Sequence, residues 1–232
     1  MLDVVRRQLD RIRCRRCCRG SWEPRVASLG VCRPRLVVCV VSPCPSVSNV
    51  INKDDEDKTL QLDSHKLLAM SGPKGDCVYF GEYILANLKL YELRNGTKLS
   101  THAATSYVRN TLAESLRSGP YQVNLLLAGY DASEDEASLY FMDYMASCQK
   151  VNSGGHGYGG MFCLSLFDKH WKPRMSREDA SDLIDKCIAE VRTRLVTAPT
   201  KYHVKIVDKD GCHTTLYDCV EKAAQAVRDE GK

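Results

Sequence analysis

The sequence contains no long hydrophobic run, and this absence excludes two classes of protein. Its longest uninterrupted apolar segment, Leu36–Val41, is far shorter than the roughly 20 residues that a membrane-spanning helix needs. The N-terminal region also has no apolar stretch of the kind found in a secretory signal peptide. We therefore expect a protein that is neither exported nor embedded in a membrane. Its 232 residues, 44% of them hydrophobic, are enough for one sizeable core and predict one main domain.

Lysine is absent from the first 35 residues, although arginine is abundant there. This segment holds ten arginines and three acidic residues, a net charge of +7, whereas the rest of the chain has a net charge of −3. A basic arm can bind nucleic acid or a membrane surface, because clustered arginines bind phosphate groups. We favour another interpretation, in which residues 1–34 are an atypical Arg/Cys-rich extension, disordered or an artefact of the gene model. The chain is then expected to bind neither nucleic acid nor membrane.

The twelve cysteines lack the spacing of a complete metal site. The segment CRRCC at residues 14–18, followed by Cys32, offers half of a tetrahedral zinc site. No second Cys-x-x-Cys and no histidine pair follows at a usual distance. The chain is also too long for a small disulfide scaffold, and Cys163 and Cys187 fall at apolar helical positions. We expect free thiols in a reducing compartment, with no metal and no cofactor.

Apolar periodicity predicts a layered domain over residues 35–217, followed by a helical tail at residues 218–232. Strands are expected at residues 36–41, 59–62, 66–70, 123–131, 139–145, 202–206 and 212–216, and helices at 75–95, 100–116, 161–167 and 176–199. Gly96, Ser100 and the Ser176-x-x-Asp179 sequence are expected to cap the helices that they adjoin. In the strand at 202–206, apolar residues alternate with His203 and Lys205, as in a half-buried strand.

The strands VNLLLAG and LYFMDYM have apolar side chains at both odd and even positions, which point to opposite faces, so both of their faces must be covered. Because pairs of helices alternate with runs of strands, the order predicts an α+β fold. We expect a four-layer α-β-β-α sandwich of two antiparallel sheets.

The glycine segment GGHGYGG at residues 154–160 formally matches the dinucleotide-binding fingerprint, since Gly155, Gly157 and Gly160 have its spacing. That fold requires a second parallel strand after the helix, whereas here Pro173 and another helix follow. We therefore expect these glycines to let a helix and a sheet approach closely. His156 is expected to be packed or hydrogen bonded within this segment rather than to act as a base.

The acidic run NKDDEDK at residues 52–58 offers several carboxylates close together. Neighbouring acids on a loop rarely converge on one reacting atom, as acid/base catalysis requires. We interpret the run as a solvated loop.

Several separated segments resemble the proteasome beta-subunit family. They are LLLAGYD at 125–131, LYFMDY at 139–144, HGYGG at 156–160, the segment at 173–180 and YHVKIVDKDG at 202–211. Shorter matches at 48–50, 53–58, 71–72 and 91–96 extend the likeness over roughly residues 36–217, and it is strongest to a non-catalytic member. The resemblance implies the N-terminal nucleophile hydrolase sandwich. It also implies a place in the heptameric beta ring of the 20S core particle, beside other alpha and beta subunits in cytoplasm and nucleus, in ATP- and ubiquitin-dependent protein degradation.

Active members of this family use a threonine at the mature N terminus, whose amino group serves as base with help from a lysine and an acid. The first threonine here is Thr59, and processing there would remove the opening strand. Lys58 matches the lysine of the family. The other positions differ: Ser42-Pro43 stands near the first-strand acid, His156 replaces the serine of the glycine loop, and Arg192 and Leu195 replace the late acid and serine. The resemblance therefore implies a non-catalytic subunit without catalytic, cofactor-binding or metal-binding residues.

An alternative is a self-standing hydrolase of the same fold, in which cleavage between Gly20 and Ser21 exposes a serine nucleophile. If the chain is instead a structural subunit, we expect the apolar helix at 161–167 to contact neighbouring subunits. The tail residues Val220, Ala224 and Val227, which recur at helical spacing, are expected to add to them.

Overall fold

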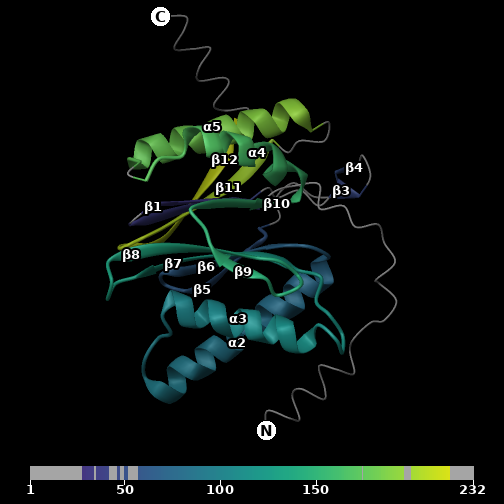
Figure 1. Cartoon of the computed structure of the whole chain (residues 1–232), viewed down its shortest axis with the longest axis vertical. Helices are drawn as coiled ribbons and strands as arrows, with labels where there is room; N and C mark the ends of the chain where they lie inside the picture. Colours follow the sequence, from purple (N-terminus) through teal and green to yellow (C-terminus); the bar gives the residue numbers. More distant parts are fainter. Residues whose placement is uncertain are drawn as a thin grey trace, which may run out of the picture.

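The described part of the chain in the computed structural model comprises residues 28–33, 35–41, 46–47, 50–51, 57–173, 175–195 and 200–219. It forms four layers, in which two antiparallel five-stranded sheets are stacked between two pairs of helices (Figure 1). This arrangement confirms the predicted α-β-β-α sandwich. Within the described residues, no helix is both long and apolar enough to cross a membrane.

The upper sheet of Figure 1 has the strand order β10-β1-β2-β11-β12. Its strands are β1 (Ser28–Arg33), β2 (Leu36–Val41), β10 (Ser153–His156), β11 (Lys201–Asp208) and β12 (Gly211–Asp218). The central strand β2 pairs with β1 on one side and with β11 on the other. The sheet therefore joins the beginning of the described chain to its end.

The lower sheet has the order β5-β6-β7-β8-β9, which follows the sequence. Its strands are β5 (Thr59–Asp63), β6 (Lys66–Ser71), β7 (Asn124–Asp131), β8 (Glu136–Met142) and β9 (Cys148–Lys150). A separate small hairpin joins β3 (Ser46–Val47) to β4 (Val50–Ile51). The six middle residues of β7 are all buried, which explains why its sequence shows no alternation of apolar and polar side chains.

Two helices cover each outer face (Figure 1). Helices α2 (Lys74–Asn95) and α3 (Thr101–Ser115) pack on the lower sheet, and α4 (Gly157–His170) and α5 (Arg177–Arg194) pack on the upper one. The buried apolar residues form three clusters, one between each pair of adjacent layers.

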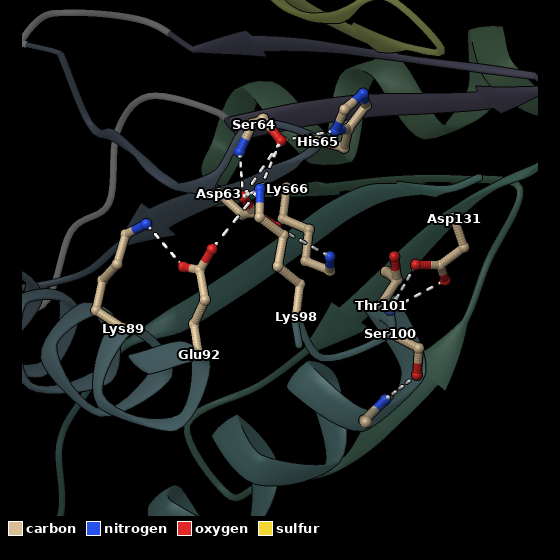
Figure 2. A network of polar contacts seen from close by, with 11 residues as sticks. Asp63, Ser64, His65, Lys66, Lys89, Glu92, Lys98, Ser100, Thr101 and Asp131 are labelled. Atoms are coloured by element: carbon tan, nitrogen blue, oxygen red, sulfur yellow. Dashed lines mark hydrogen bonds and ion pairs between the residues drawn. The ribbon is translucent and has the colours of Figure 1, made fainter. Parts of the chain in front are cut away.

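The helix ends follow the predicted capping residues. Gly96, at φ 66°, ends α2 in the left-handed conformation that glycine adopts readily. Ser100 accepts a hydrogen bond from Ala103 N at the start of α3, where the Asp131 carboxylate also accepts one from Thr101 N at 2.9 Å (Figure 2). The Ser176-x-x-Asp179 sequence forms a capping box at the start of α5.

Strand β1 lies before the domain boundary that the sequence analysis placed at residue 35. Residues 28–32 are all buried, so they show no alternation, and Gly30, which packs against Leu139, weakens the strand pattern further. The domain therefore includes residues 28–33. Residues 1–27 of the expected extension and residues 220–232 of the expected tail lie outside the described part of the chain.

The glycine segment is half strand and half helix. Residues 153–156 form β10, which pairs with β1, and α4 begins at Gly157. A Cβ atom on Gly160 would lie 2.7 Å from the carbonyl carbon of Gly155, so helix and strand backbones meet here without space for a side chain. The predicted role in close backbone approach is confirmed for Gly155 and Gly160.

We predict that Gly160→Ala lowers the free energy of unfolding by about 1–3 kcal/mol, because the opposing atoms belong to rigid backbone. Urea unfolding of the full-length chain measures this change. The matched control is Gly75→Ala in the first turn of α2, where an added Cβ meets nothing within 4 Å. Its effect should stay within about 0.5 kcal/mol, and equal losses for the two variants would contradict the explanation.

Candidate functional site

His156 occupies the position at which the resemblance places the serine of active members. It is the last residue of β10, is only 6% exposed and lies opposite Ser28, the first described residue of β1. Its Nε2 atom is 2.9 Å from the carbonyl oxygen of Leu125 on β7, and its ring stacks on Phe141 of β8 with centroids 4.1 Å apart. A residue of the upper sheet is thereby bonded to the lower sheet.

The Leu125 carbonyl can only accept a hydrogen bond, so Nε2 of His156 must carry the proton. Burial lowers the pKa of His156, and this exceeds the opposing effects of the bond to Leu125 and the charge of Asp143. The ring is therefore a neutral donor that joins the two sheets. The expectation that His156 is packed and hydrogen bonded is confirmed.

Ser28 begins β1 within the same buried corner. It is 1% exposed, and its cross-strand neighbours are Val41 of β2 and His156 of β10. Ser28 is therefore paired with a strand on each side and lies inside the upper sheet.

Lys58 immediately precedes β5, and its carbonyl oxygen accepts a hydrogen bond from Met70 N at 3.0 Å. It thus leads into the lower sheet, whereas Ser28 and His156 belong to the upper one. Arg192 is exposed on α5, and Leu195 packs half-buried against the cluster between α5 and the upper sheet. The other position taken from the family, Ser42-Pro43, lies outside the described residues.

Asp57, the one described acid of the run interpreted as a solvated loop, is exposed and also forms an ion pair with the upper sheet. Its carboxylate accepts hydrogen bonds from Lys205 Nζ on β11 at 2.5 Å and from Thr59 N at 2.9 Å. Burial alone would raise the pKa of Asp57, but the bonds from Lys205 and Thr59 outweigh it and lower the pKa below its usual value. Residues 52–56 of the run lie outside the described part.

Lys205, the partner in this ion pair, differs from expectation. The alternation in β11 predicted a solvated side chain, yet the residue is only 8% exposed. A buried ammonium group needs a charged partner, and Asp57 supplies it from a position 148 residues earlier. No local sequence pattern could have indicated this pair.

A second polar cluster surrounds Asp63 at the β5–β6 turn and was also missed (Figure 2). Asp63 accepts hydrogen bonds from Lys98 Nζ at 2.5 Å and from the buried Lys66 at 3.5 Å. Burial raises its pKa, but the bonds from Lys98 and Ser64 dominate and lower it. The cluster fixes the turn to the segment between α2 and α3.

His65 connects the same turn to the upper sheet. Its Nε2 atom donates to the carbonyl oxygen of Lys209 at 3.2 Å, so Nδ1 is the acceptor for the Ser64 hydroxyl at 2.8 Å. The β5–β6 turn is therefore tied to the β11–β12 turn.

The residues that the structure describes contain no group of three or more His, Cys, Asp or Glu side chains that could hold a metal ion. Cys32, a candidate fourth zinc ligand, is buried in β1, and its thiol donates to the Ala137 carbonyl at 3.4 Å. Burial raises the pKa of this thiol to about 12, and the side chain lies in the interior rather than at the surface. Residues 14–18 lie outside the described part.

We predict that His156 makes stability depend on pH. Its pKa is lowered in the folded state, so below about pH 6.5 the unfolded chain takes up a proton that the folded chain does not. The free energy of unfolding should fall by up to about 1 kcal/mol between pH 7 and pH 5.5 through this residue. His156→Gln keeps an N–H donor but does not titrate, so urea unfolding at both pH values should show a smaller decrease. Equal decreases in the two proteins would disprove the assignment.

Comparison with known proteins agrees with this geometry. The family model described as "Proteasome subunit" matches residues 26–207. The chain is 54% identical to proteasome subunit beta type-2 of Oryza sativa over 164 residues, which cover 71% of this chain and 77% of that protein. It is 48% identical to proteasome subunit beta type-2 of Dictyostelium discoideum over 177 residues, or 75% of this chain and 89% of the relative. Proteasome subunit beta type-4 of Saccharomyces cerevisiae is 44% identical over 160 residues, or 68% of this chain and 81% of the relative. With a family match over most of its length and relatives of this similarity, the chain belongs to the proteasome subunit family.

Proposed function

We propose that this chain is a non-catalytic structural subunit of the 20S proteasome core particle. In this role it fills one position of the beta ring, contacts other alpha and beta subunits and helps to wall the proteolytic chamber. It thereby takes part in ATP- and ubiquitin-dependent protein degradation in the cytoplasm and nucleus. The observation that carries the proposal is the state of His156, a neutral, buried hydrogen-bond donor at the position where the resemblance places the glycine-loop serine of active members.

The environment of Thr59 supports the same conclusion. Its N–H donates to the Asp57 carboxylate at 2.9 Å, and the residue pairs with Ala69 inside the β5–β6 hairpin. Cleavage before Thr59 would free its amino group, as a nucleophile of this family requires. It would also remove β1 and the central strand β2, which hold the upper sheet together.

The outer face of α4 supports an assembled state. Cys163 and Phe167 point into the core and are fully buried, whereas Met161 is 69% exposed and Leu164 is 41% exposed. Tyr158 extends this apolar face by one turn and is 43% exposed. Large apolar side chains gathered on one exposed helix face are typical of a protein interface. We propose that this face contacts another proteasome subunit.

Native purification of the tagged, full-length chain tests the proposal. We expect a particle many times heavier than one chain, containing related alpha and beta subunits. When this particle is treated with a peptide epoxyketone, which reacts with N-terminal hydroxyl nucleophiles, mass spectrometry should find adducts on other beta subunits and none on this chain. A monomer or small homo-oligomer, or an adduct on this chain at a cut terminus such as Ser21, would disprove the structural role.

The α4 face can be tested separately. We predict that Met161→Glu together with Leu164→Glu lowers incorporation into the native particle at least about tenfold, because each buried carboxylate would lack a partner. Quantitative mass spectrometry of particle and free fractions measures incorporation, and circular dichroism checks folding. The control is Ser181→Glu, an exposed position on α5 outside this face, whose hydroxyl donates to a carbonyl oxygen of its own helix. Normal incorporation of the folded double variant would exclude this face as an interface.

A further inference from the structure

A cavity of about 690 Å³ lies between α3 and the β8–β9 region of the lower sheet. Its volume is in the range of sites that hold small molecules or single peptide side chains. Three nitrogen-bearing side chains, four hydroxyls and one thiol are among its lining groups: Arg109, Lys150, His102, Thr105, Ser106, Tyr140, Ser147 and Cys148. This composition differs from the apolar face of α4 and points to a polar ligand.

Arg109 is held in place by the wall of the cavity. Its Nε atom donates to the carbonyl oxygen of Ala146 at 3.3 Å, and Ala146 has a positive φ of 64° that is unusual for a residue other than glycine. The Asp143 carboxylate maintains this turn by accepting hydrogen bonds from Met145 N at 3.0 Å and Ser147 N at 2.8 Å. The guanidinium group is thus fixed through Nε, and its planar fork can accept a carboxylate with little loss of side-chain freedom.

The charges around the cavity suit a ligand with a single negative charge. Arg109 and Lys150 contribute two positive charges, and Glu136, whose carboxylate is 2.7 Å from Lys150 Nζ, cancels one of them. The nearby carboxylates of Asp131 and Asp143 accept backbone N–H groups of Thr101 and of the Asp143–Ser147 turn and do not line the cavity. The remaining single positive charge would not neutralise a phosphate dianion.

We propose that this cavity binds a carboxylate of an acidic peptide segment from a partner protein. The guanidinium of Arg109 holds the carboxylate, Lys150 adds a second positive charge, and the hydroxyls of Ser106 and Ser147 offer further hydrogen bonds. The lining residues all belong to this chain, so the site does not depend on the proposed function of the chain.

Cys148 provides a reporter inside the cavity. Burial raises the pKa of its thiol, while the positive charge of Arg109, which lines the same cavity, opposes this. Iodoacetate and iodoacetamide alkylate thiols in the same way: sulfur forms a bond to the CH₂ carbon, iodide leaves and the thiol proton passes to the buffer. The two reagents differ in that only iodoacetate carries a carboxylate.

The experiment compares the two alkylation rates at Cys148 of the full-length chain by peptide mass spectrometry, with the half-buried Cys77 on α2 as internal reference. We expect the iodoacetate-to-iodoacetamide ratio to be at least threefold higher at Cys148 than at Cys77. Arg109→Gln should remove this difference. Arg94→Gln, which makes the same charge change on α2 outside the cavity, should preserve it.

Competition identifies the ligand class. Millimolar acetyl-Gly-Glu-Gly-amide should slow iodoacetate at Cys148 at least twofold, and the Gln peptide should have no effect. A peptide whose carboxylate is at its C terminus distinguishes a terminal from a side-chain source. Equal ratios at Cys148 and Cys77, persistence of the difference in folded Arg109→Gln, or stronger competition by inorganic phosphate than by the Glu peptide would each overturn the proposal.

Discussion

The face-to-face packing of the two sheets is the constraint on which the rest of this structure depends. Val37 and Cys39 of the upper sheet meet Leu126 and Leu139 of the lower sheet in one apolar cluster, and all four are fully buried. This packing shields the inner faces of both sheets from water, and the two helix pairs shield the outer faces. Any polar group that enters this interior must find a partner there. His156 satisfies this requirement by donating to a backbone carbonyl of the opposite sheet.

The same constraint connects fold and proposed function. The resemblance implies that an active member would need an N-terminal threonine with a free amino group. Here the corner at Ser28 and His156 is closed by strand pairing and ring stacking, and Asp57, beside the lysine position of the family, forms an ion pair with Lys205. His156 and Asp57, which lie near positions that are catalytic in active members, therefore connect the two sheets.

Sequence patterns predicted the features that depend on neighbouring residues alone, such as helix ends. The ends of α2, α3 and α5 followed from Gly96, Ser100 and the Ser176–Asp179 box, because a cap depends on residues within one turn. Strand β1 could not be predicted in the same way, since a strand covered on both faces has no alternation and its partner β10 lies far along the chain. The Asp57–Lys205 and Asp63–Lys98 pairs were also missed, because their partners meet only through the fold.

The strand order also determines when each half of the sandwich can form. The lower sheet and its two helices use one continuous stretch, from β5 to β9, so their contacts become possible as soon as residues 59–150 have been synthesised. The upper sheet instead places β1 and β2 beside β10 and β11, which are synthesised only after the whole lower sheet. Until then the β1–β2 hairpin has two unpaired edges, and such edges can pair with other chains. Interrupted synthesis before residue 200 would therefore leave a folded lower half carrying an incomplete, aggregation-prone upper sheet.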